Sequence, residues 1–431
     1  MPGLFRARLT TPIAVLLSFA ICVAANFGAA EDEIPAAPTE TPPLLIGMAK
    51  VDITPDLNEM PVSLNGYGGR ARAKATGVRD PIFVRALVAI DPHGSQIAVV
   101  STDLCYVTTI VHDEALSKLA VDGFDDHNFL LTATHNHSGF AGYDRSFIAK
   151  VAMGAFDEKI LKYLTDSIAE AVREARASAE PARIEMASKD VFGLNRSRLD
   201  PGFVHGNESA NTAPDTGAHP VNRTLTVLKF SRTDGSTIGA LVHFTAHPTV
   251  LSPKSTRVSA DYPGVVYRRV EEALGPETTV LYMNGPLGDA APSPDWVEGV
   301  SEDRQMEDYG EALSKAILDV MASRRAFTAN DVAGSAVREP FERVVVRSWG
   351  RSELPHFLSR AFYVDPEVTF QTTRLGSLVV IAVPGEATYA TGEMYQTMCP
   401  PGARCIVTGP ANAYMGYLVT REQYEVDGYE S

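Results

Sequence analysis

The sequence has few cysteines, few positive charges and no long apolar segment after its first 30 residues. Its 431 residues include 4 cysteines, 38 lysines and arginines, and 53 aspartates and glutamates, for a formal net charge of −15. So acidic a chain repels phosphate backbones, and we expect no nucleic-acid partner. The same charge disfavours docking on anionic lipid by electrostatics alone, although a transient contact with a membrane surface stays open.

Several common catalytic motifs are also missing. The sequence has no H-E-x-x-H helix, no G-x-S-x-G elbow, no G-x-x-x-x-G-K-[ST] loop and no convincing dinucleotide fingerprint. These absences exclude the commonest helix-borne zinc sites, serine hydrolase sites and nucleotide-binding loops. The composition is nevertheless that of a globular protein with a large core, because 45% of the residues are hydrophobic.

Residues 1–30 have the three parts of a secretory signal. Arg6 and Arg8 precede an apolar stretch over residues 12–25, and small residues end at Ala30. We therefore expect export to the periplasm or the exterior, with cleavage taking the net charge from −15 to −17. An uncleaved membrane anchor is the alternative, but the apolar run is short for a span of about 20 residues.

The rest of the chain divides into a linker and one large domain. Residues 31–43 are rich in proline, alanine, threonine and acidic residues, which is typical of a flexible linker. We expect one catalytic domain over residues 44–431, since large α/β enzymes often keep a single unit of this size.

Three cysteines remain after the signal. Cys399 and Cys405 bracket a turn-rich loop, and in an oxidising compartment they could close a small disulfide. Cys105 follows an apolar strand, and we expect a buried free thiol there rather than a nucleophile.

Hydrophobic patterning predicts an α/β fold of mixed β-sheets flanked by helices. The helical patterns cover residues 157–178, 262–274 and 303–324. Strands are predicted at residues 83–91, 96–101, 128–134, 225–230, 238–247, 278–283, 344–346 and 377–383. No internal repeat is visible. The polar segment 200–220 is predicted to be a long loop, of the kind that borders a site or moves.

Polar residues stand where five of the predicted strands end. These residues are His135 with His137, His247, Glu386, Asn284 with Asp289, and Asp103. Loops just beyond strand ends are where ligands bind in α/β folds, so the five strands could supply one rim.

His135 and His137 are the most informative pair, because residues two apart in an extended chain share a face. Two surface or hydrogen-bonded histidines are the alternative, and His247 alone would more often be a satisfied core residue. Imidazole with carboxylate suits a catalytic zinc that keeps one position open for water. Such a zinc lowers the pKa of its water to about 7 and polarises a carbonyl, which suits amide hydrolysis.

Eight segments together resemble the neutral/alkaline (non-lysosomal) ceramidase family, in the family's order. They are residues 47–55, 66–68, 132–139, 195–197, 246–249, 284–292, 384–386 and 417–430. The resemblance implies that family's catalytic fold and one Zn²⁺ per chain. The implied zinc ligands are His135, His247, Glu386 and Tyr417.

The resemblance also implies that His137, Arg196 and Tyr429 face the scissile amide. The tyrosine assignments are open, because Tyr414 and Tyr424 compete for the same roles. By composition alone all four tyrosines would be packing residues, and Arg196 would be a surface residue in a turn.

The sequence departs from the family pattern in two places. The family's Gly-Asp-x-Ser-Pro loop is Gly288-Asp-Ala-Ala-Pro292 here, so Ala291 replaces a serine whose hydroxyl the family uses. A methyl group cannot attack, and Ser293 would project differently. Ceramidases also continue into an immunoglobulin-like domain, whereas this sequence stops at Ser431. We expect a single-domain relative without that domain, and a missing end of the chain is the alternative.

These features predict a zinc-dependent hydrolase of N-acyl amides that works by metal-activated water. The resemblance implies a ceramide-like N-acyl sphingoid, or a related lipid amide, as the substrate. Two alternatives remain: a relative altered at Ala291 that only binds a lipid or amide ligand, and a hydrolase of another acyl bond such as an ester.

Overall fold

The computed structural model describes residues 6–8, 43–205, 216–293, 299–340, 345–348, 352–353 and 367–426. Its main elements fall into three groups that share one order along the chain: three strands, a helix, a fourth strand and a second helix. In every group the first three strands are antiparallel neighbours, and the fourth is parallel to the third.

The groups have the following bounds. The first contains β2 (Leu45–Asp52), β4 (Phe83–Ile90), β5 (Gln96–Thr102), α2 (Thr109–Leu119), β6 (Phe129–Ala133) and α4 (Glu158–Ala177). The second contains β7 (Glu180–Asp190), β9 (Thr224–Arg232), β10 (Thr237–Phe244), α5 (Tyr262–Leu274), β12 (Thr279–Asn284) and α6 (Glu302–Ala322). The third contains β15 (Val332–Pro340), β18 (Glu367–Leu375), β19 (Leu378–Ala382), α8 (Tyr389–Gln396), β21 (Arg404–Thr408) and α9 (Arg421–Val426).

Shorter elements lie between these. They are β1 (Arg6–Arg8), η1 (Gly68–Arg70), β3 (Gly77–Val78), η2 (Ala120–Asp122), α3 (Phe147–Ala152), β8 (Asn195–Ser197), β11 (Arg257–Val258), β13 (Ala290–Pro292), β14 (Arg325–Ala326), β16 (Val345–Ser348), β17 (Ser352–Glu353), β20 (Glu386–Ala387) and β22 (Tyr417–Leu418).

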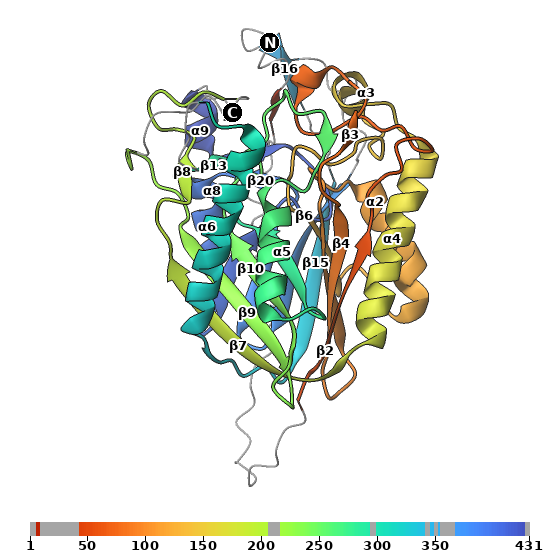
Figure 1. Cartoon of the computed structure of the whole chain (residues 1–431), viewed down its shortest axis with the longest axis vertical. Helices are drawn as coiled ribbons and strands as arrows, with labels where there is room; N and C mark the ends of the chain where they lie inside the picture. The colour runs from red at the N-terminus through yellow and green to blue at the C-terminus, as the bar shows by residue number, and fades with distance from the viewer. Residues whose placement is uncertain are drawn as a thin grey trace.

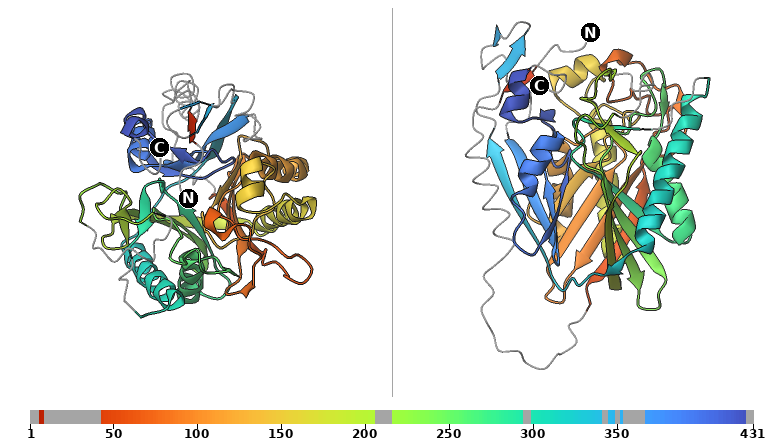
Figure 2. Two further views of the ribbon diagram at one scale, coloured as in Figure 1. Left: turned by 90° about the horizontal axis from the view of Figure 1, so that it is seen from above. Right: turned by 90° about the vertical axis from the view of Figure 1, so that its left-hand side faces the viewer.

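The first two groups form one mixed sheet of nine strands, in the order β12-β10-β9-β7-β2-β4-β5-β6 with β14 beside β7. Its halves meet where β2 pairs with β7, through two residue pairs only. The third group forms a separate sheet in the order β15-β18-β19-β21. Seen from above, the three groups lie around a common centre, with α4, α5 and α6 on the outside (Figure 2).

The inner faces of all three groups share a central core. Leu130 of β6, Leu281 of β12 and Val380 of β19 belong to this one cluster of buried apolar side chains. The outer faces pack on helices, as on α4, where Leu164 joins the cluster that contains Val88 of β4. Because strand residues alternate between faces, these strands need apolar residues on both sides, which explains their continuous apolar runs.

The fold class predicted from the sequence is confirmed, since mixed sheets are flanked by helices (Figure 1). The three predicted helices are present, and the predicted apolar strands agree within a few residues. The long strand β7 was missed because its charged and apolar residues alternate. Residues 206–215 of the predicted loop 200–220 lie outside the described residues, as do most of the signal, residues 31–42 of the linker, and Tyr429.

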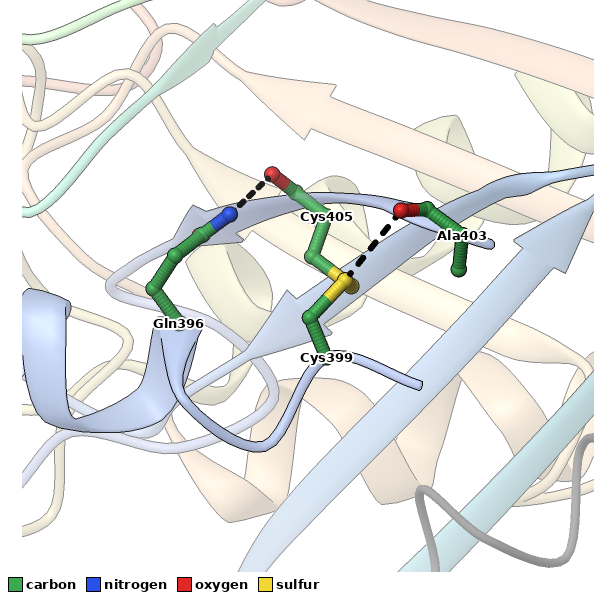
Figure 3. Close-up of a disulfide and its surroundings, with 4 residues drawn as sticks. All are labelled: Gln396, Cys399, Ala403 and Cys405. Carbon is green, nitrogen blue, oxygen red and sulfur yellow. Dashed lines mark hydrogen bonds between the residues drawn. A yellow bond between two sulfur atoms is a disulfide. The ribbon is translucent and has the colours of Figure 1, made fainter. Parts of the chain in front are cut away.

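The predicted disulfide and the predicted buried free thiol are confirmed. Cys399 and Cys405 form a disulfide that joins the end of α8 to the start of β21 (Figure 3). Gln396 closes the same loop by donating its side-chain amide to the Cys405 carbonyl at 2.9 Å. Cys105 is a free thiol, 2% exposed. Among the described residues, no helix has both the length and the apolar character that crossing a bilayer requires.

Candidate metal centre

Three of the predicted ligands lie together where strands of all three groups end. His135 follows β6, His247 follows β10, and Glu386 begins β20 shortly after β19. None of the three is more than 3% exposed. Each group therefore supplies one member of a buried trio at the carboxyl ends of the strands.

The facing atoms of this trio have the spacing of metal ligands. The Oε2 atom of Glu386 lies 3.1 Å from Nε2 of His247 and 3.4 Å from Nε2 of His135. Two ligand atoms on a tetrahedral zinc with bonds of 2.0–2.1 Å are about 3.3 Å apart. Both spacings are therefore compatible with ligands of one divalent metal, and the three groups lie close enough together to hold one.

Both imidazole rings are oriented by backbone carbonyls. Nδ1 of His135 donates to the Cys105 carbonyl at 2.6 Å, and Nδ1 of His247 donates to the Ala290 carbonyl at 3.0 Å. A carbonyl can only accept, so the proton sits on Nδ1 and each Nε2 can offer its lone pair to a metal. This arrangement behind a histidine is typical of metal ligands.

His135 has an unusual backbone as well. Its φ of +68° lies in the left-handed region, which costs an L-residue about 1–2 kcal/mol. Residues held in this way cluster at functional sites.

The charges of the trio are tightly coupled. Although burial raises the pKa of the Glu386 carboxyl, the neighbouring histidines hold it well below its usual range. Burial lowers the pKa of His135, but Glu386 and Cys105 outweigh it and raise that pKa to about 10. Burial and then Arg198 lower the pKa of His247 to about 3. Without a metal, His135 is therefore an imidazolium paired with the Glu386 carboxylate beside a neutral His247, and a metal at Nε2 of His135 would displace the second proton of that ring.

His137 stands beside the trio, with its Nε2 3.3 Å from Nε2 of His135. Burial, followed by His135 and His247, lowers its pKa well below the usual value, so it is neutral. Arg70 donates to the His137 carbonyl, and the Tyr67 ring meets the imidazole edge-on at 4.6 Å. The spacing of the H-x-H pair therefore does bring both rings into one site.

Gly66 completes the packing around His137. Its φ is +90°, and a Cβ added there would lie 2.3 Å from Cγ of His137. Only glycine allows so close an approach. The close contact with His137 thus explains why a glycine stands at position 66, in a segment that resembles the ceramidase family.

Asn284 joins the two segments that carry His135 and His247 through hydrogen bonds of its side chain. Its amide donates to the carbonyls of Thr134 and Ala246, each at 2.9 Å, and its Oδ1 accepts from the Ala246 backbone at 3.1 Å. Thr408 of the third group donates to the Asn284 carbonyl at 2.8 Å. Asn284 therefore links all three groups, through the residues that directly precede His135 and His247.

Asp103 and Asp289, also predicted at strand ends, use their carboxylates differently. Asp103 accepts from the Tyr267 hydroxyl at 3.0 Å and from the Phe83 backbone at 2.9 Å. Asp289 accepts from the Tyr389 backbone at 2.7 Å. These two side chains hold the surrounding segments in place.

Two tyrosines approach Glu386 in different ways. Tyr417 pairs with Glu386 in the short parallel pair of β22 and β20, and its hydroxyl lies 3.3 Å from Nη1 of Arg198. Tyr414 donates its hydroxyl to Oε1 of Glu386 at 2.5 Å. Tyr424, the other competing candidate, lies on α9.

Arg196 is 2% exposed, so it is not the surface residue that composition alone favoured. It stands opposite Ala291 in the pairing of β8 with β13, and its guanidinium lies 5.2 Å from the Phe203 ring. Ala291 is fully buried. Arg198 was missed, because nothing in the pattern of an irregular loop marks it as pointing toward Tyr417.

Comparison with known proteins gives a family. A family model described as neutral/alkaline non-lysosomal ceramidase, N-terminal, matches residues 44–301 and 356–431. The neutral ceramidase of Mycobacterium tuberculosis is 23% identical over 90% of this chain and 73% of that protein. The neutral ceramidase of Pseudomonas aeruginosa is 27% identical over 52% of this chain, but over only 32% of its own length.

Solved structures show the same fold. The crystal structure of neutral ceramidase from Pseudomonas aeruginosa has a TM-score of 0.77 at 20% identity, covering 90% of this chain and 70% of that one. A structure described as ceramidase complexed with C2 has a TM-score of 0.75 at 19% identity, covering 90% and 71%. The family match, which covers most of the chain, shows that this protein belongs to the neutral/alkaline non-lysosomal ceramidase family.

Proposed function

We propose that this protein hydrolyses the N-acyl amide bond of a ceramide-like N-acyl sphingoid, or a related lipid amide, at a single zinc centre. The proposed ligands are His135, His247, Glu386 and Tyr417. The family supports the class of reaction, since its named members are ceramidases.

One observation carries the proposal. Two imidazole Nε2 atoms and one carboxylate oxygen converge in a buried site, and both Nδ1 protons are already bound by carbonyls. Burying two imidazoles and a carboxylate costs free energy unless a partner such as a metal ion binds them together. A bound zinc would polarise the substrate carbonyl and lower the pKa of a water to about 7.

The residues around the trio have proposed roles in moving protons and holding substrate. His137 is neutral, is held by Arg70 and faces the same space as the ligands, so it would take a proton from the attacking water. Arg196 would orient the carbonyl or a hydroxyl head group. Tyr429 would assist there, as the resemblance implies.

Ala291 motivates a second candidate function. Its side chain is a buried methyl at the position of the family serine, so the hydroxyl used in ceramidases is missing at this point. A relative altered in this way could retain the metal and bind a lipid amide without turnover. Ala291→Ser separates the two ideas: turnover by the native protein excludes the pure binder, whereas activity that appears only in Ala291→Ser supports it.

The main test is metal analysis joined to a screen of N-acyl substrates of graded chain length. We expect about one zinc per chain in the native protein, with metal and hydrolysis both lost in His247→Ala. The matched control is His93→Ala, in the exposed turn between β4 and β5, which should retain both. An active protein without metal would refute the zinc mechanism, and preferred cleavage of esters would shift the reaction class.

We also propose that residues 1–30 direct export. The support is the charge and hydropathy pattern of that segment, together with a disulfide between Cys399 and Cys405 that suits an oxidising compartment. The N-terminal sequence of the protein recovered from the culture medium or periplasm would test this. A mature protein that still begins at Met1 would contradict cleavage.

A further inference from the structure

We propose that Tyr414 is a positioning residue that makes Glu386 a one-oxygen ligand. This inference rests on the proposed metal site. The hydroxyl of Tyr414 binds Oε1 of Glu386 and holds that oxygen away from the metal, so that only Oε2 faces the two histidines. Tyr414 thereby sets the coordination number of the centre without being a ligand itself.

The two oxygens of the carboxylate have separate partners. Oε1 accepts from Tyr414 at 2.5 Å, while Oε2 lies 3.1 Å and 3.4 Å from Nε2 of His247 and His135. A carboxylate can bind a metal through one oxygen or two. A hydrogen bond to one oxygen fixes the carboxylate plane and removes the two-oxygen mode, which leaves a position for water.

The Tyr414 ring is held by its neighbours. Tyr106 stacks on it with a centroid distance of 4.2 Å and an angle of 9° between the planes. The Tyr106 hydroxyl in turn donates to Asp144 at 2.8 Å. Tyr106 directly follows Cys105, whose carbonyl orients His135. One short segment thus supports both a ligand histidine and the tyrosine behind the ligand carboxylate.

The backbone around Tyr414 is bonded to both ligand-bearing strands. Asn412 donates its backbone amide to Leu131 of β6 at 2.8 Å. Met415 donates to Pro384 at 2.9 Å, and Glu386 donates to Gly416 at 2.9 Å. Tyr414 therefore cannot shift relative to the site without breaking bonds to the segments that carry His135 and Glu386.

These contacts also separate the two neighbouring tyrosines. The Tyr417 hydroxyl lies beside Arg198, whereas the Tyr414 hydroxyl is already used by Glu386. The ligand role of Tyr417 stays what the resemblance implies. Tyr414 suits the supporting role.

The variant Tyr414→Phe tests the proposal, because it removes the hydroxyl and retains the stacked ring. We expect its Kd for Zn²⁺, measured by competition with a chromophoric chelator, to rise about 10- to 100-fold, the usual loss when a group behind a ligand is removed. The visible absorption of the Co²⁺-substituted protein should also change, since Oε1 is now free to bind the ion. Neither readout depends on turnover.

Tyr309→Phe, on α6, is the matched control, because it also removes one buried tyrosine hydroxyl, the one that donates to the Leu194 carbonyl at 2.6 Å. We expect its Kd and Co²⁺ spectrum to match those of the native protein, and all three metal-free proteins to unfold at similar urea concentrations. Equal losses of affinity in both variants would show a general packing effect and overturn the proposal.

The outcomes also separate this proposal from the proposed function. A native protein that binds no Zn²⁺ or Co²⁺ overturns both. A native protein that binds Zn²⁺ with a Tyr414→Phe variant of the same affinity and the same Co²⁺ spectrum overturns the role of Tyr414 alone. If Tyr414→Phe is too unstable for titration, the Co²⁺ spectrum of the folded fraction decides, and an unchanged spectrum counts against the proposal.

Discussion

Replacing Gly66 by alanine should disable His137 while leaving the proposed metal ligands in place. A Cβ at this position would lie 2.3 Å from Cγ and 2.6 Å from Cβ of His137, far inside van der Waals contact. The imidazole cannot simply retreat, because Arg70 holds the His137 carbonyl and Tyr67 packs against the ring. The collision must move the His137 ring or the Gly66 backbone.

The cost has two parts that can be separated. Alanine at a positive φ costs about 1–2 kcal/mol, and overpacking a filled site costs about 1–3 kcal/mol more. Gly94 provides a matched control, because its φ of +87° is close to the +90° of Gly66 and a Cβ there meets nothing within 4 Å. Gly94→Ala should therefore show the first cost alone.

Urea unfolding, bound zinc and turnover of an N-acyl substrate are the three measurements. We expect Gly94→Ala to lose about 1–2 kcal/mol of stability with full activity, since only the dihedral cost applies. Gly66→Ala should lose about 2–5 kcal/mol, retain its zinc, and turn over on the order of 100-fold more slowly, since an error of 1 Å in a catalytic group costs about that much. Equal kcat/KM in the two variants would refute the role of His137 or the tightness of its packing.

Three further predictions concern stability. Asn284→Asp should destabilise the protein by about 3 kcal/mol or more in urea unfolding, because a buried carboxylate would face two carbonyls that now accept hydrogen bonds. Burial raises the pKa of Asp261 from 3.8 to about 7, so the folded state retains a proton that the unfolded state loses, and stability should fall between about pH 4 and pH 7. This decline should amount to on the order of 4 kcal/mol and should be absent in the variant Asp261→Asn. A variant whose stability falls with pH in parallel with that of the native protein would contradict the prediction. Chelation of the proposed zinc should lower the Tm. The loss of stability should be about 4 kcal/mol if the free metal concentration was 1,000-fold above Kd. An unchanged Tm would show that the metal does not stabilise the fold.

The strands that the sequence predicted well are those buried on both faces. Strands β4, β5, β10 and β12 read as continuous apolar runs because helices cover one side and the central core covers the other. Strand β7 alternates charged and buried residues, and β15 is only partly buried along most of its length, so neither has such a run.

The repeated order of the three groups could not be predicted from the sequence. The three groups share the direction of their strands and the place of their helices along the chain. Both depend on where the chain turns, and neither depends on which apolar residues fill the core. Different side chains can fill equivalent layers if the volume and the pattern are retained. The repeat is therefore a property of topology that leaves no period in the residues.

The positions of the three proposed ligands could be predicted from the sequence, but the residues that hold those ligands in place could not. His135, His247 and Glu386 follow strong apolar strands, so their position at one rim followed from the direction of those strands. Tyr414, Arg70 and Arg198 lie outside regular strands and helices or at the end of a single short turn, where no periodicity says which way a side chain points. Sequence alone also left Tyr414 and Tyr417 as competitors, and only their different hydrogen-bond partners separate them.

The position of the trio links the core to the chemistry. Each sheet group supplies one member, so no group could hold the centre by itself. The spacing of the donor atoms is set by how the inner faces pack in the central core and by Asn284, which joins the groups. Since a metal site tolerates errors of about 0.5 Å, a core substitution that lets one sheet slide should weaken metal binding before it unfolds the protein.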